Sequence, residues 1–327
     1  MLGDRPGDRI ETQRRKTALY GIYLQESIQP AESCIVDLGL RYDEVRFDIS
    51  GTRTEDYDYS AGTYVPAADP EGIDKSFGKA SPRLGVSYKL IDGLNIYAQF
   101  AKGIQTPTEG ELSENPQLNL VEITNYEVGL KTRYPRWSLD SALYYSPVDN
   151  EVVQVVGPGG QTRYVNSGKT IKKGFEISAA WFVLSDLEVG GAYSYADYTF
   201  DDFTEPVDTG GATVDVDRGG NRLPYVPEDQ FSLFVSYRHG SGIRLRMETL
   251  YWGSYYIDNA NSEKYEGYAF VTNAMAAYAR GDFEISLNAE NLFDDAYATE
   301  VEKDTRGVVR YTPAAPRRLM LRLTYRL

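Results

Sequence analysis

No stretch of 18 consecutive apolar residues occurs in the chain, and a membrane-spanning helix needs about that length. The first residues, MLGDRPGDRIETQRRK, also lack the apolar core of a secretory signal peptide. The mean hydropathy of −0.44 would suit a soluble protein. It does not exclude a transmembrane β-barrel, because only every second residue of a barrel strand faces lipid.

Residues that carry catalytic or metal chemistry are scarce. The one cysteine, Cys34, is in phase with the apolar residues that follow it, so we expect a packed thiol, and no disulfide can form within the chain. The one histidine, His239, lies in a turn, and local spacing to Ser236 or Ser241 is poor support for a Ser-His-Asp triad. No CxxC or HExxH pattern occurs. The sequence therefore predicts no enzyme, no metal site and no cofactor.

Acidic residues outnumber basic ones by 48 to 34, and the net charge of −14 argues against nucleic acid as a partner. Two long segments are rich in carboxylates. Oxygen-rich clusters can bind Ca²⁺, but neither segment has the EF-hand spacing. We therefore interpret them as solvated loops that divalent cations bridge loosely, rather than as a specific site. The residues are Glu55, Asp56, Asp58, Asp69, Glu71 and Asp74 in 49–78, and Asp201, Asp202, Glu205, Asp208, Asp215 and Asp217 in 199–224.

Tyrosine is abundant, with 27 residues against 12 Phe and 3 Trp. It favours β-strands in general and also forms the aromatic girdles of membrane barrels. Thirteen segments alternate apolar and polar residues, and a period of two indicates strands. In the clearest segment, Leu319, Leu321, Leu323, Tyr325 and Leu327 share one face, opposite Met320, Arg322, Thr324 and Arg326. The predicted strands are 16–27, 33–48, 79–90, 93–102, 119–133, 136–148, 163–182, 186–198, 225–238, 242–255, 268–279, 282–297 and 316–327.

The connections between these segments alternate short and long. Outer-membrane barrels have short periplasmic turns and longer extracellular loops, whereas a soluble sandwich has no reason to place every long loop at one end. This regularity predicts an antiparallel membrane barrel whose last strand runs inward. Single-chain bacterial barrels have an even number of strands, so a count of thirteen indicates either one miscounted strand or a fragment. We favour a fragment whose true N-terminus is missing. The long connections are 49–78, 103–118, 149–162, 199–224, 256–267 and 298–315.

Several motifs follow one another along the chain: SPRLGVSYKL (81–90), LNIYAQFAKGIQTPTEGEL (94–112), NYEVGLK (125–131), YVNSGKTIKKGFEIS (164–178), RLPYVPEDQFSLFVSY (222–237), NLFDDAY (291–297) and PAAPRRLMLRLTYRL (313–327). In this order they resemble the barrel of TonB-dependent outer-membrane receptors, across roughly residues 16–327. The resemblance implies an all-β fold, with about 13 strands of a 22-stranded barrel and no plug domain. Residues 1–15 are then a disordered or loop remnant. The chain ends in Leu327, where the family usually ends in an aromatic residue.

The resemblance also implies a function. Such a receptor imports ferric siderophore or a similar bulky nutrient across the bacterial outer membrane. Its partners are outer-membrane lipid, lipopolysaccharide and the TonB-ExbB-ExbD system, reached through the missing N-terminal region. We expect the fragment alone to be inactive in transport. A passive porin or adhesin-type barrel is the alternative, and a soluble β-sandwich is a third interpretation.

Two sets of residues are candidates for contacts inside the barrel. An arginine near the bilayer midplane costs about 2–4 kcal/mol on the lipid face, so the arginines of the last strands are expected to point into the lumen. There they would face the plug: Arg238, Arg244, Arg246, Arg322 and Arg326, with Glu248. Three residues of the last external loop are candidates for binding an anionic iron chelate: Arg306, Arg310 and Tyr311.

Overall fold

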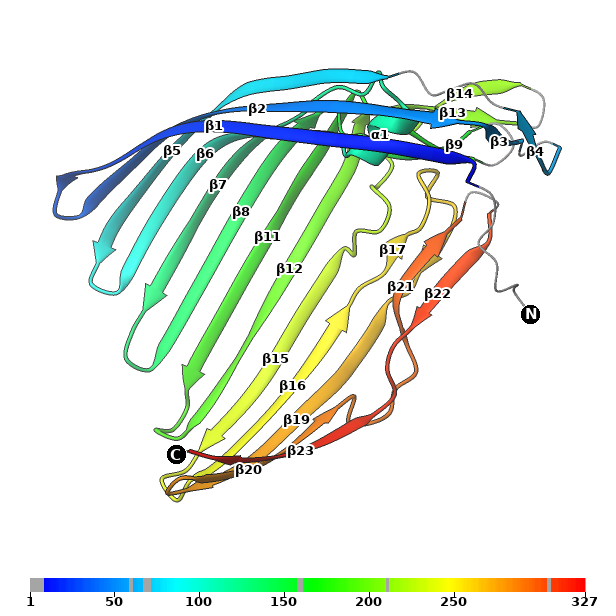
Figure 1. Ribbon diagram of the computed structural model, residues 1–327. Coiled ribbons are helices and arrows are strands. Elements are labelled where there is room, and N and C mark those ends of the chain that lie inside the picture. The colour runs from blue at the N-terminus through cyan, green and yellow to red at the C-terminus, as the bar shows by residue number, and fades with distance from the viewer. Residues whose placement is uncertain are drawn as a thin grey trace.

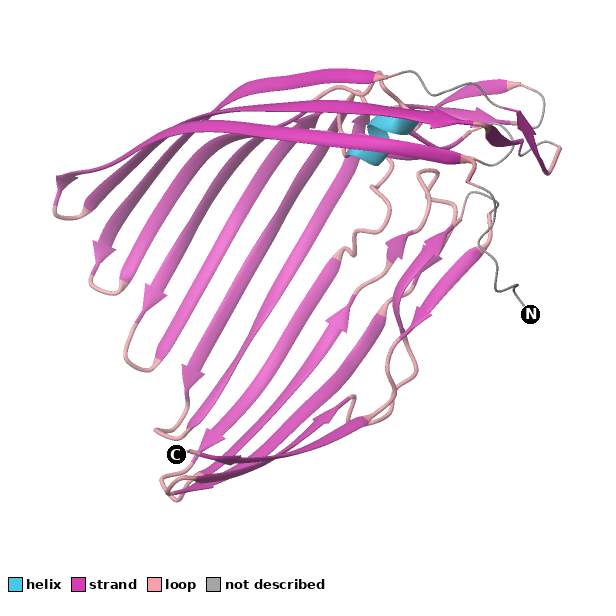
Figure 2. Cartoon of the chain, in the orientation of Figure 1, coloured by secondary structure: helices cyan, strands magenta, loops and turns pink. Residues whose placement is uncertain are grey.

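In the computed structural model, the described residues are 9–58, 61–66, 72–157, 161–209, 212–304 and 307–326. They form one antiparallel sheet of thirteen strands, paired in chain order from β1 to β23 (Figures 1 and 2). The predicted fold class and the count of thirteen strands are confirmed. The strands are β1 (Glu11–Ala31), β2 (Cys34–Arg53), β5 (Ile73–Ile91), β6 (Leu94–Gln105), β7 (Val121–Arg133), β8 (Trp137–Asp149), β11 (Lys169–Phe182), β12 (Leu187–Asp202), β15 (Asp229–Arg238), β16 (Ile243–Trp252), β19 (Tyr268–Arg280), β20 (Phe283–Glu290) and β23 (Arg318–Tyr325).

Strand boundaries differ from the prediction at several places. Strand β1 begins at Glu11, before the predicted start at 16. The predicted strand 163–182 is wrong as a single element, because Ser167 and Gly168 separate β10 (Thr162–Asn166) from β11. The predicted strand 282–297 ends at Glu290, because Asn291 has a positive φ of 50° and turns the chain out of the sheet.

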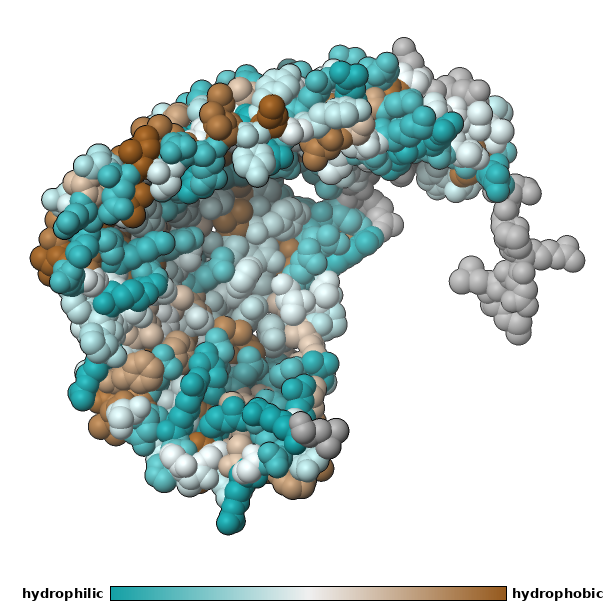
Figure 3. Space-filling model, turned by 60° about the vertical axis from the view of Figure 1, so that its left-hand side comes forward, coloured by the Kyte–Doolittle hydropathy of each residue, from teal (hydrophilic) through white to brown (hydrophobic). Residues whose placement is uncertain are grey.

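The sheet has two chemically distinct faces, which the pairing registers define. On what we call the apolar face, Ile22 lies opposite Tyr42 and Leu24 opposite Leu40. Ile22 and Leu24 are both 74% exposed, so this face has no covering within the described chain. On the polar face, Asp43 lies opposite Lys79. Figure 3 shows hydrophobic side chains along the convex left-hand edge and mostly hydrophilic ones in the hollow.

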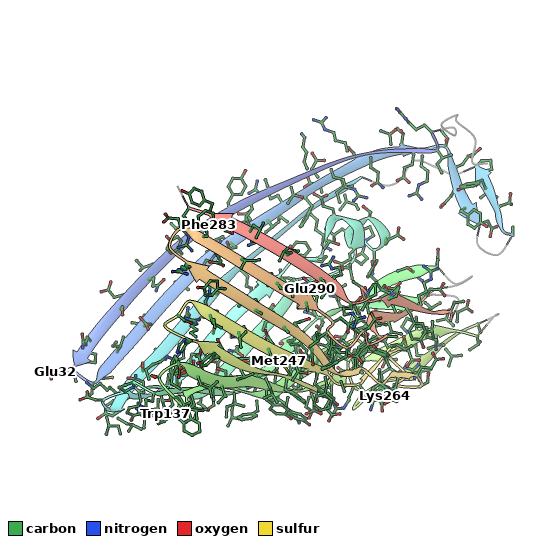
Figure 4. All side chains as sticks on the ribbon, turned by 90° about the horizontal axis from the view of Figure 1, so that it is seen from below. Glu32, Trp137, Met247, Lys264, Phe283 and Glu290 are labelled. Atoms are coloured by element: carbon green, nitrogen blue, oxygen red, sulfur yellow. The ribbon has the colours of Figure 1, made fainter. Side chains whose placement is uncertain are left out.

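Aromatic side chains form two bands on the apolar face. One band lies toward the long connections, which we call the outer end, and the other lies toward the short turns, the inner end. In Figure 4 the labelled residues Glu32, Trp137 and Phe283 all lie toward the inner end. On β8, the eight residue steps from Trp137 to Tyr145 correspond to roughly 26 Å along the strand, close to the apolar band of a membrane barrel. The outer band contains Tyr20, Tyr42, Tyr126, Tyr145, Phe231 and Tyr251; the inner band contains Tyr88, Trp137, Trp181, Tyr237, Phe283 and Tyr325.

The long connections contain structure that the sequence patterns did not predict. Within the described parts of these connections, five two-stranded hairpins extend beyond the sheet, and the helix α1 (Glu109–Glu114) lies beneath β1 and β2 (Figure 1). The helix has a capping box formed by Thr108 and Glu111. The hairpins are β3 (Glu55–Asp58) with β4 (Thr63–Pro66), β9 (Val152–Val156) with β10, β13 (Thr204–Asp208) with β14 (Thr213–Asp217), β17 (Tyr255–Tyr256) with β18 (Lys264–Tyr265), and β21 (Ala298–Lys303) with β22 (Val309–Pro313).

Residues of the polar face form a small core with α1 at the outer end. Phe47 and Phe77 pack with Leu112 and Leu118, and the Thr17 hydroxyl donates to the Glu109 carboxylate. The polar face is therefore the inside of the curved sheet at this level. Among the described residues, no helix combines the length and apolar character needed to cross a bilayer.

Candidate functional site

The predicted lumenal residues of the last strands share the polar face. Arg238 lies opposite Arg244, and Ser236 lies opposite Arg246. Arg322 lies opposite Ser286 on the neighbouring strand. Their sequence neighbours on the apolar face include Leu245, Met247 and Leu323, each at least 44% exposed. We call this group the inner arginine patch: Arg238, Arg244, Arg246, Arg322 and Arg326, with Glu248.

Carboxylates of the sheet neutralise part of the inner arginine patch. A guanidinium nitrogen of Arg244 lies 2.6 Å from a Glu284 carboxylate oxygen, and Arg326 approaches the same carboxylate at 3.8 Å. Arg246 lies 3.5 Å from Glu248. Arg238 and Arg244 are directly opposed like charges, which destabilises a sheet unless an anion lies nearby. The patch thus retains positive charge that an acidic surface could neutralise.

The structure brings together only part of the set of three residues that were predicted to bind a ligand at the outer mouth of the barrel. Arg306 lies outside the described residues. Arg310 already has a carboxylate partner, because its guanidinium lies 2.9 Å from Asp304. Tyr311 is 64% exposed and lines a hollow of 560 Å³ with Tyr265, Tyr268 and Tyr297. Alternation along β22 points Arg310 and Tyr311 to opposite sides of the hairpin.

His239 makes a local contact in the turn between β15 and β16. Its Nδ1 lies 2.9 Å from the Ser241 hydroxyl, and its backbone N–H donates to the Ile243 carbonyl. Ser236 lies on the polar face of β15, opposite Arg246. His239 and Ser241 are therefore neighbours whose contact stabilises this turn.

A groove of 520 Å³ crosses the polar face at its centre, and sequence reasoning did not find it. Its floor consists of small residues on four adjacent strands: Ala142, Ser178, Ser194 and Ser232. Tyr97 lies at one end and Trp252 and Tyr268 lie at the other. The sequence does place small residues at lumenal positions of neighbouring strands, and this pattern could have indicated the groove. Without the strand registers, however, these residues could not be aligned with one another.

A charged clamp holds two outer hairpins together. The Lys303 ammonium lies 3.2 Å from Asp258 and 2.9 Å from Glu263. Hydrogen bonding to Glu263, opposed by partial burial and assisted by Asp258, raises the pKa of Lys303. Burial opposes ionisation of Asp258, but hydrogen bonds from Ser262 and Lys303 outweigh it and lower the pKa of Asp258.

These two shifts define the pH window of the clamp. A raised lysine pKa contributes stability below about pH 10, and a lowered aspartate pKa contributes stability above about pH 4. We expect spin labels at Lys264 and Glu300 to give one narrow distance distribution from pH 5 to 9 and a distribution that broadens only below about pH 4, as the pH falls through the lowered pKa of Asp258. The matched variant Lys303→Met should be broad throughout. A distribution as narrow in Lys303→Met as in the wild-type chain at neutral pH would contradict this account.

An antiparallel sheet with one exposed apolar face, two aromatic bands and a polar inner face is the wall of a transmembrane β-barrel. The barrel model of the TonB dependent receptor-like family matches residues 3–292. The chain belongs to this family, whose members are outer-membrane receptors.

Relatives of this chain are receptors by name, and several are named as siderophore receptors. The ferrioxamine receptor of Yersinia enterocolitica is 26% identical over 300 residues, which cover 89% of this chain and 38% of that protein. The catecholate siderophore receptor Fiu of Escherichia coli K12 is also 26% identical, over 94% of this chain and 41% of that protein. The chain thus spans about two fifths of the curated relatives it matches.

The fold is similar to solved receptor structures. The siderophore receptor PiuA from Acinetobacter baumannii superposes with a TM-score of 0.78 at 20% identity, over 96% of this chain and 44% of PiuA. At this identity the likeness supports the fold alone. The predicted family and fold class are confirmed by the family match and by this likeness.

Proposed function

We propose that this chain forms part of the wall of a receptor that imports a ferric siderophore or a similar bulky nutrient across the bacterial outer membrane, with energy from the TonB-ExbB-ExbD system. The observation that carries the proposal is the family match over residues 3–292. The names of relatives, ferrioxamine and catecholate siderophore receptors, support iron chelates as the ligand class. No chemical step is required of the protein, since binding and gated passage suffice.

Two groups of residues have proposed roles in this process. The inner arginine patch docks acidic side chains of a plug domain, because Arg238 and Arg322 make no ion pair with any residue that the structure describes. At the outer mouth, Arg306, Arg310 and Tyr311 contact the incoming ligand. Because Arg310 already pairs with Asp304, the aromatic ring of Tyr311 contributes more than Arg310 to ligand binding there.

Uptake of radioactive iron by whole cells tests the function. Deletion of the coding gene should abolish uptake of the cognate ferric chelate, and a protonophore should abolish uptake in the intact strain.

We expect Tyr311→Ala to weaken binding of the chelate about three- to tenfold. We expect the double variant Arg244→Glu with Arg322→Glu to raise the passive permeability of the outer membrane, because it loosens the contact with the plug. The control Arg9→Glu, at an exposed position before β1, should behave as wild type.

The alternative function is a passive porin or an adhesin-type barrel. Uptake that continues in the presence of a protonophore would support the porin and defeat the receptor proposal. The apolar face and aromatic bands suit both alternatives, whereas the siderophore-receptor relatives favour the energy-coupled receptor.

A further inference from the structure

A pocket of 330 Å³ opens on the apolar face at its inner end, between β19, β20 and β23. Two rows of paired residues line it, and Phe283, labelled in Figure 4, belongs to the row nearest the short turns. In that row Arg280 lies opposite Phe283, and Phe283 lies opposite Tyr325. The second row lies two residues further along each strand, about 7 Å deeper in the bilayer. It contains Tyr278, Ile285 and Leu323.

The face on which the pocket lies keeps it open to lipid. A domain inside the lumen contacts the polar face of the sheet, which is the opposite one. A strand added beside β23 would continue the sheet in its own plane, so it would extend the apolar face and leave it uncovered. Arg280 lies two strands from that edge, roughly 10 Å away. The bilayer is therefore the medium that contacts this pocket.

Arg280 provides a positive charge without a partner on this face. Its side chain is exposed and makes no ion pair or hydrogen bond with any residue that the structure describes. Other basic residues near the short turns have carboxylate partners. Lys89 pairs with Asp92 at 2.6 Å, and Arg133 pairs with Asp140 at 2.7 Å.

The chemistry of arginine at an interface indicates what Arg280 binds. An arginine near the membrane surface lays its aliphatic stem on apolar neighbours and extends its guanidinium to the headgroup level. A guanidinium binds a phosphate through two parallel hydrogen bonds. The free guanidinium of Arg280 is therefore suited to the phosphate of a phospholipid.

The turn beside Arg280 carries the opposite charge. Gly281 has a positive φ of 59° and reverses the chain between β19 and β20, and Asp282 follows it. Asp282 is exposed, and its carboxylate makes no ion pair within the described part of the chain. Its backbone carbonyl accepts from the Arg326 N–H at 2.9 Å, which fixes the turn. A cation and an anion two residues apart match a zwitterionic headgroup, in which phosphate and ammonium are joined covalently.

The walls of the pocket suit an acyl chain. The rings of Phe283 and Tyr325 pack with centroids 4.7 Å apart, within the inner aromatic band at headgroup level. Deeper in the bilayer, Ala276 lies between Leu245 on β16 and Leu287 on β20. The small alanine leaves a shallow path between two larger side chains, in line with the pocket. The volume of 330 Å³ is near the lower end of the range for small-molecule sites, which suits a segment of one chain.

We propose that this pocket binds one phospholipid of the periplasmic leaflet, and that the lipid carries a primary ammonium in its headgroup, as phosphatidylethanolamine does. The guanidinium of Arg280 pairs with the phosphate, and the carboxylate of Asp282 pairs with the ammonium. One acyl chain lies against Ile285 and Leu323. The short turns of an outer-membrane barrel lie on the periplasmic side, which determines the leaflet. This lipid site is separate from the proposed transport function.

Native mass spectrometry of the purified chain in detergent tests the proposal. The probes are phosphatidylethanolamine, phosphatidylglycerol and phosphatidylcholine with identical acyl chains. Phosphatidylglycerol has the phosphate without a cation, and the ammonium of phosphatidylcholine has no N–H to donate to a carboxylate. We expect the chain to retain one phosphatidylethanolamine at a lower lipid concentration than either of the other two lipids.

Variants separate the headgroup from the acyl chain. Arg280→Gln should weaken phosphatidylethanolamine binding about tenfold. Asp282→Asn should weaken it about threefold and strengthen phosphatidylglycerol binding. Ile285→Trp fills the pocket without a change of charge and should weaken binding of all three lipids. The matched control is Arg136→Gln, because Arg136 is exposed in the turn before β8, at the same end of the sheet but outside the pocket. It should have no effect.

The contrary outcomes are equally specific. Equal losses from Arg280→Gln and Arg136→Gln would indicate general attraction of lipid to positive charge and would overturn the proposal. Tighter binding of phosphatidylglycerol than of phosphatidylethanolamine, or retention of no lipid, would also overturn it. Circular dichroism on each variant confirms the strand content before binding is compared. If Arg280→Gln fails that check, Arg280→Lys replaces it, since it retains the charge and loses the paired hydrogen bonds; binding as tight as in the wild type would then contradict the assigned role of Arg280.

Discussion

Met247→Arg is expected to destabilise the folded chain in lipid vesicles by about 2–4 kcal/mol, the cost of an arginine near the bilayer midplane on the lipid face of a barrel. Met247 is 44% exposed on the apolar face, and its neighbours on either side, Arg246 and Glu248, lie on the polar face. The protein therefore carries charges at 246 and 248 but an apolar side chain at 247. Reversible unfolding by guanidinium chloride in phospholipid vesicles measures the difference.

The matched control adds the same charge on the other face. Ser178→Arg lies on the polar face of β11, where Ser178 is exposed at the floor of the groove. We expect a change of less than about 1 kcal/mol there, since water can solvate the guanidinium. Equal destabilisation by the two variants would contradict the assignment of the faces.

Asn291→Ala is expected to cost about 2–4 kcal/mol, through lost hydrogen bonds and backbone strain. Asn291 is 4% exposed and has a φ of 50°. Its side chain accepts from the Asp295 N–H at 2.9 Å and donates to the carbonyls of Asp295, at 2.9 Å, and Ala315, at 3.3 Å. Alanine would leave these buried backbone groups without their partner in a conformation that alanine disfavours.

Two substitutions at the same position separate these causes. Asn291→Gly tolerates the positive φ but loses every side-chain hydrogen bond, and Asn291→Asp retains only the acceptor for the Asp295 N–H. We expect each to be less destabilising than Asn291→Ala in the same vesicle assay. If alanine were tolerated as well as glycine, the backbone contribution would be negligible and this explanation would fail.

The motif NLFDDAY shows how far sequence reasoning reached. Its residue types are enough to predict that Asn291 and Asp294 satisfy backbone groups at a strand end, and the structure confirms it: the Asp294 carboxylate accepts from the Arg317 N–H at 2.8 Å. The local chemistry of Asn and Asp made this prediction possible, because both tolerate positive φ and accept from nearby N–H groups. The end of β20 at Glu290 was missed, because a period of two continues into a turn without a change of composition.

The outer hairpins were missed for a related reason. Short paired segments such as β9 and β10 are only five residues each, too short for alternation to be distinguished from chance. Their positions depend on contacts between distant segments, for example the hydrogen bond from the Asn259 amide to the Gln154 carbonyl at 3.1 Å. Such contacts have no signature in either segment alone.

The sequence by itself determined the two-faced strands, their number and order, and which side chains face lipid, because alternation along one strand assigns each residue to a face without knowledge of its neighbours. Only the tertiary structure decided which lumenal residues meet. Strand registers place Glu176 between Tyr97 and Trp252 across seven strands. Packing of the loop after β21 places Asp304 beside Arg310. Register and loop packing depend on pairing between strands, and pairing is a property of the assembled sheet.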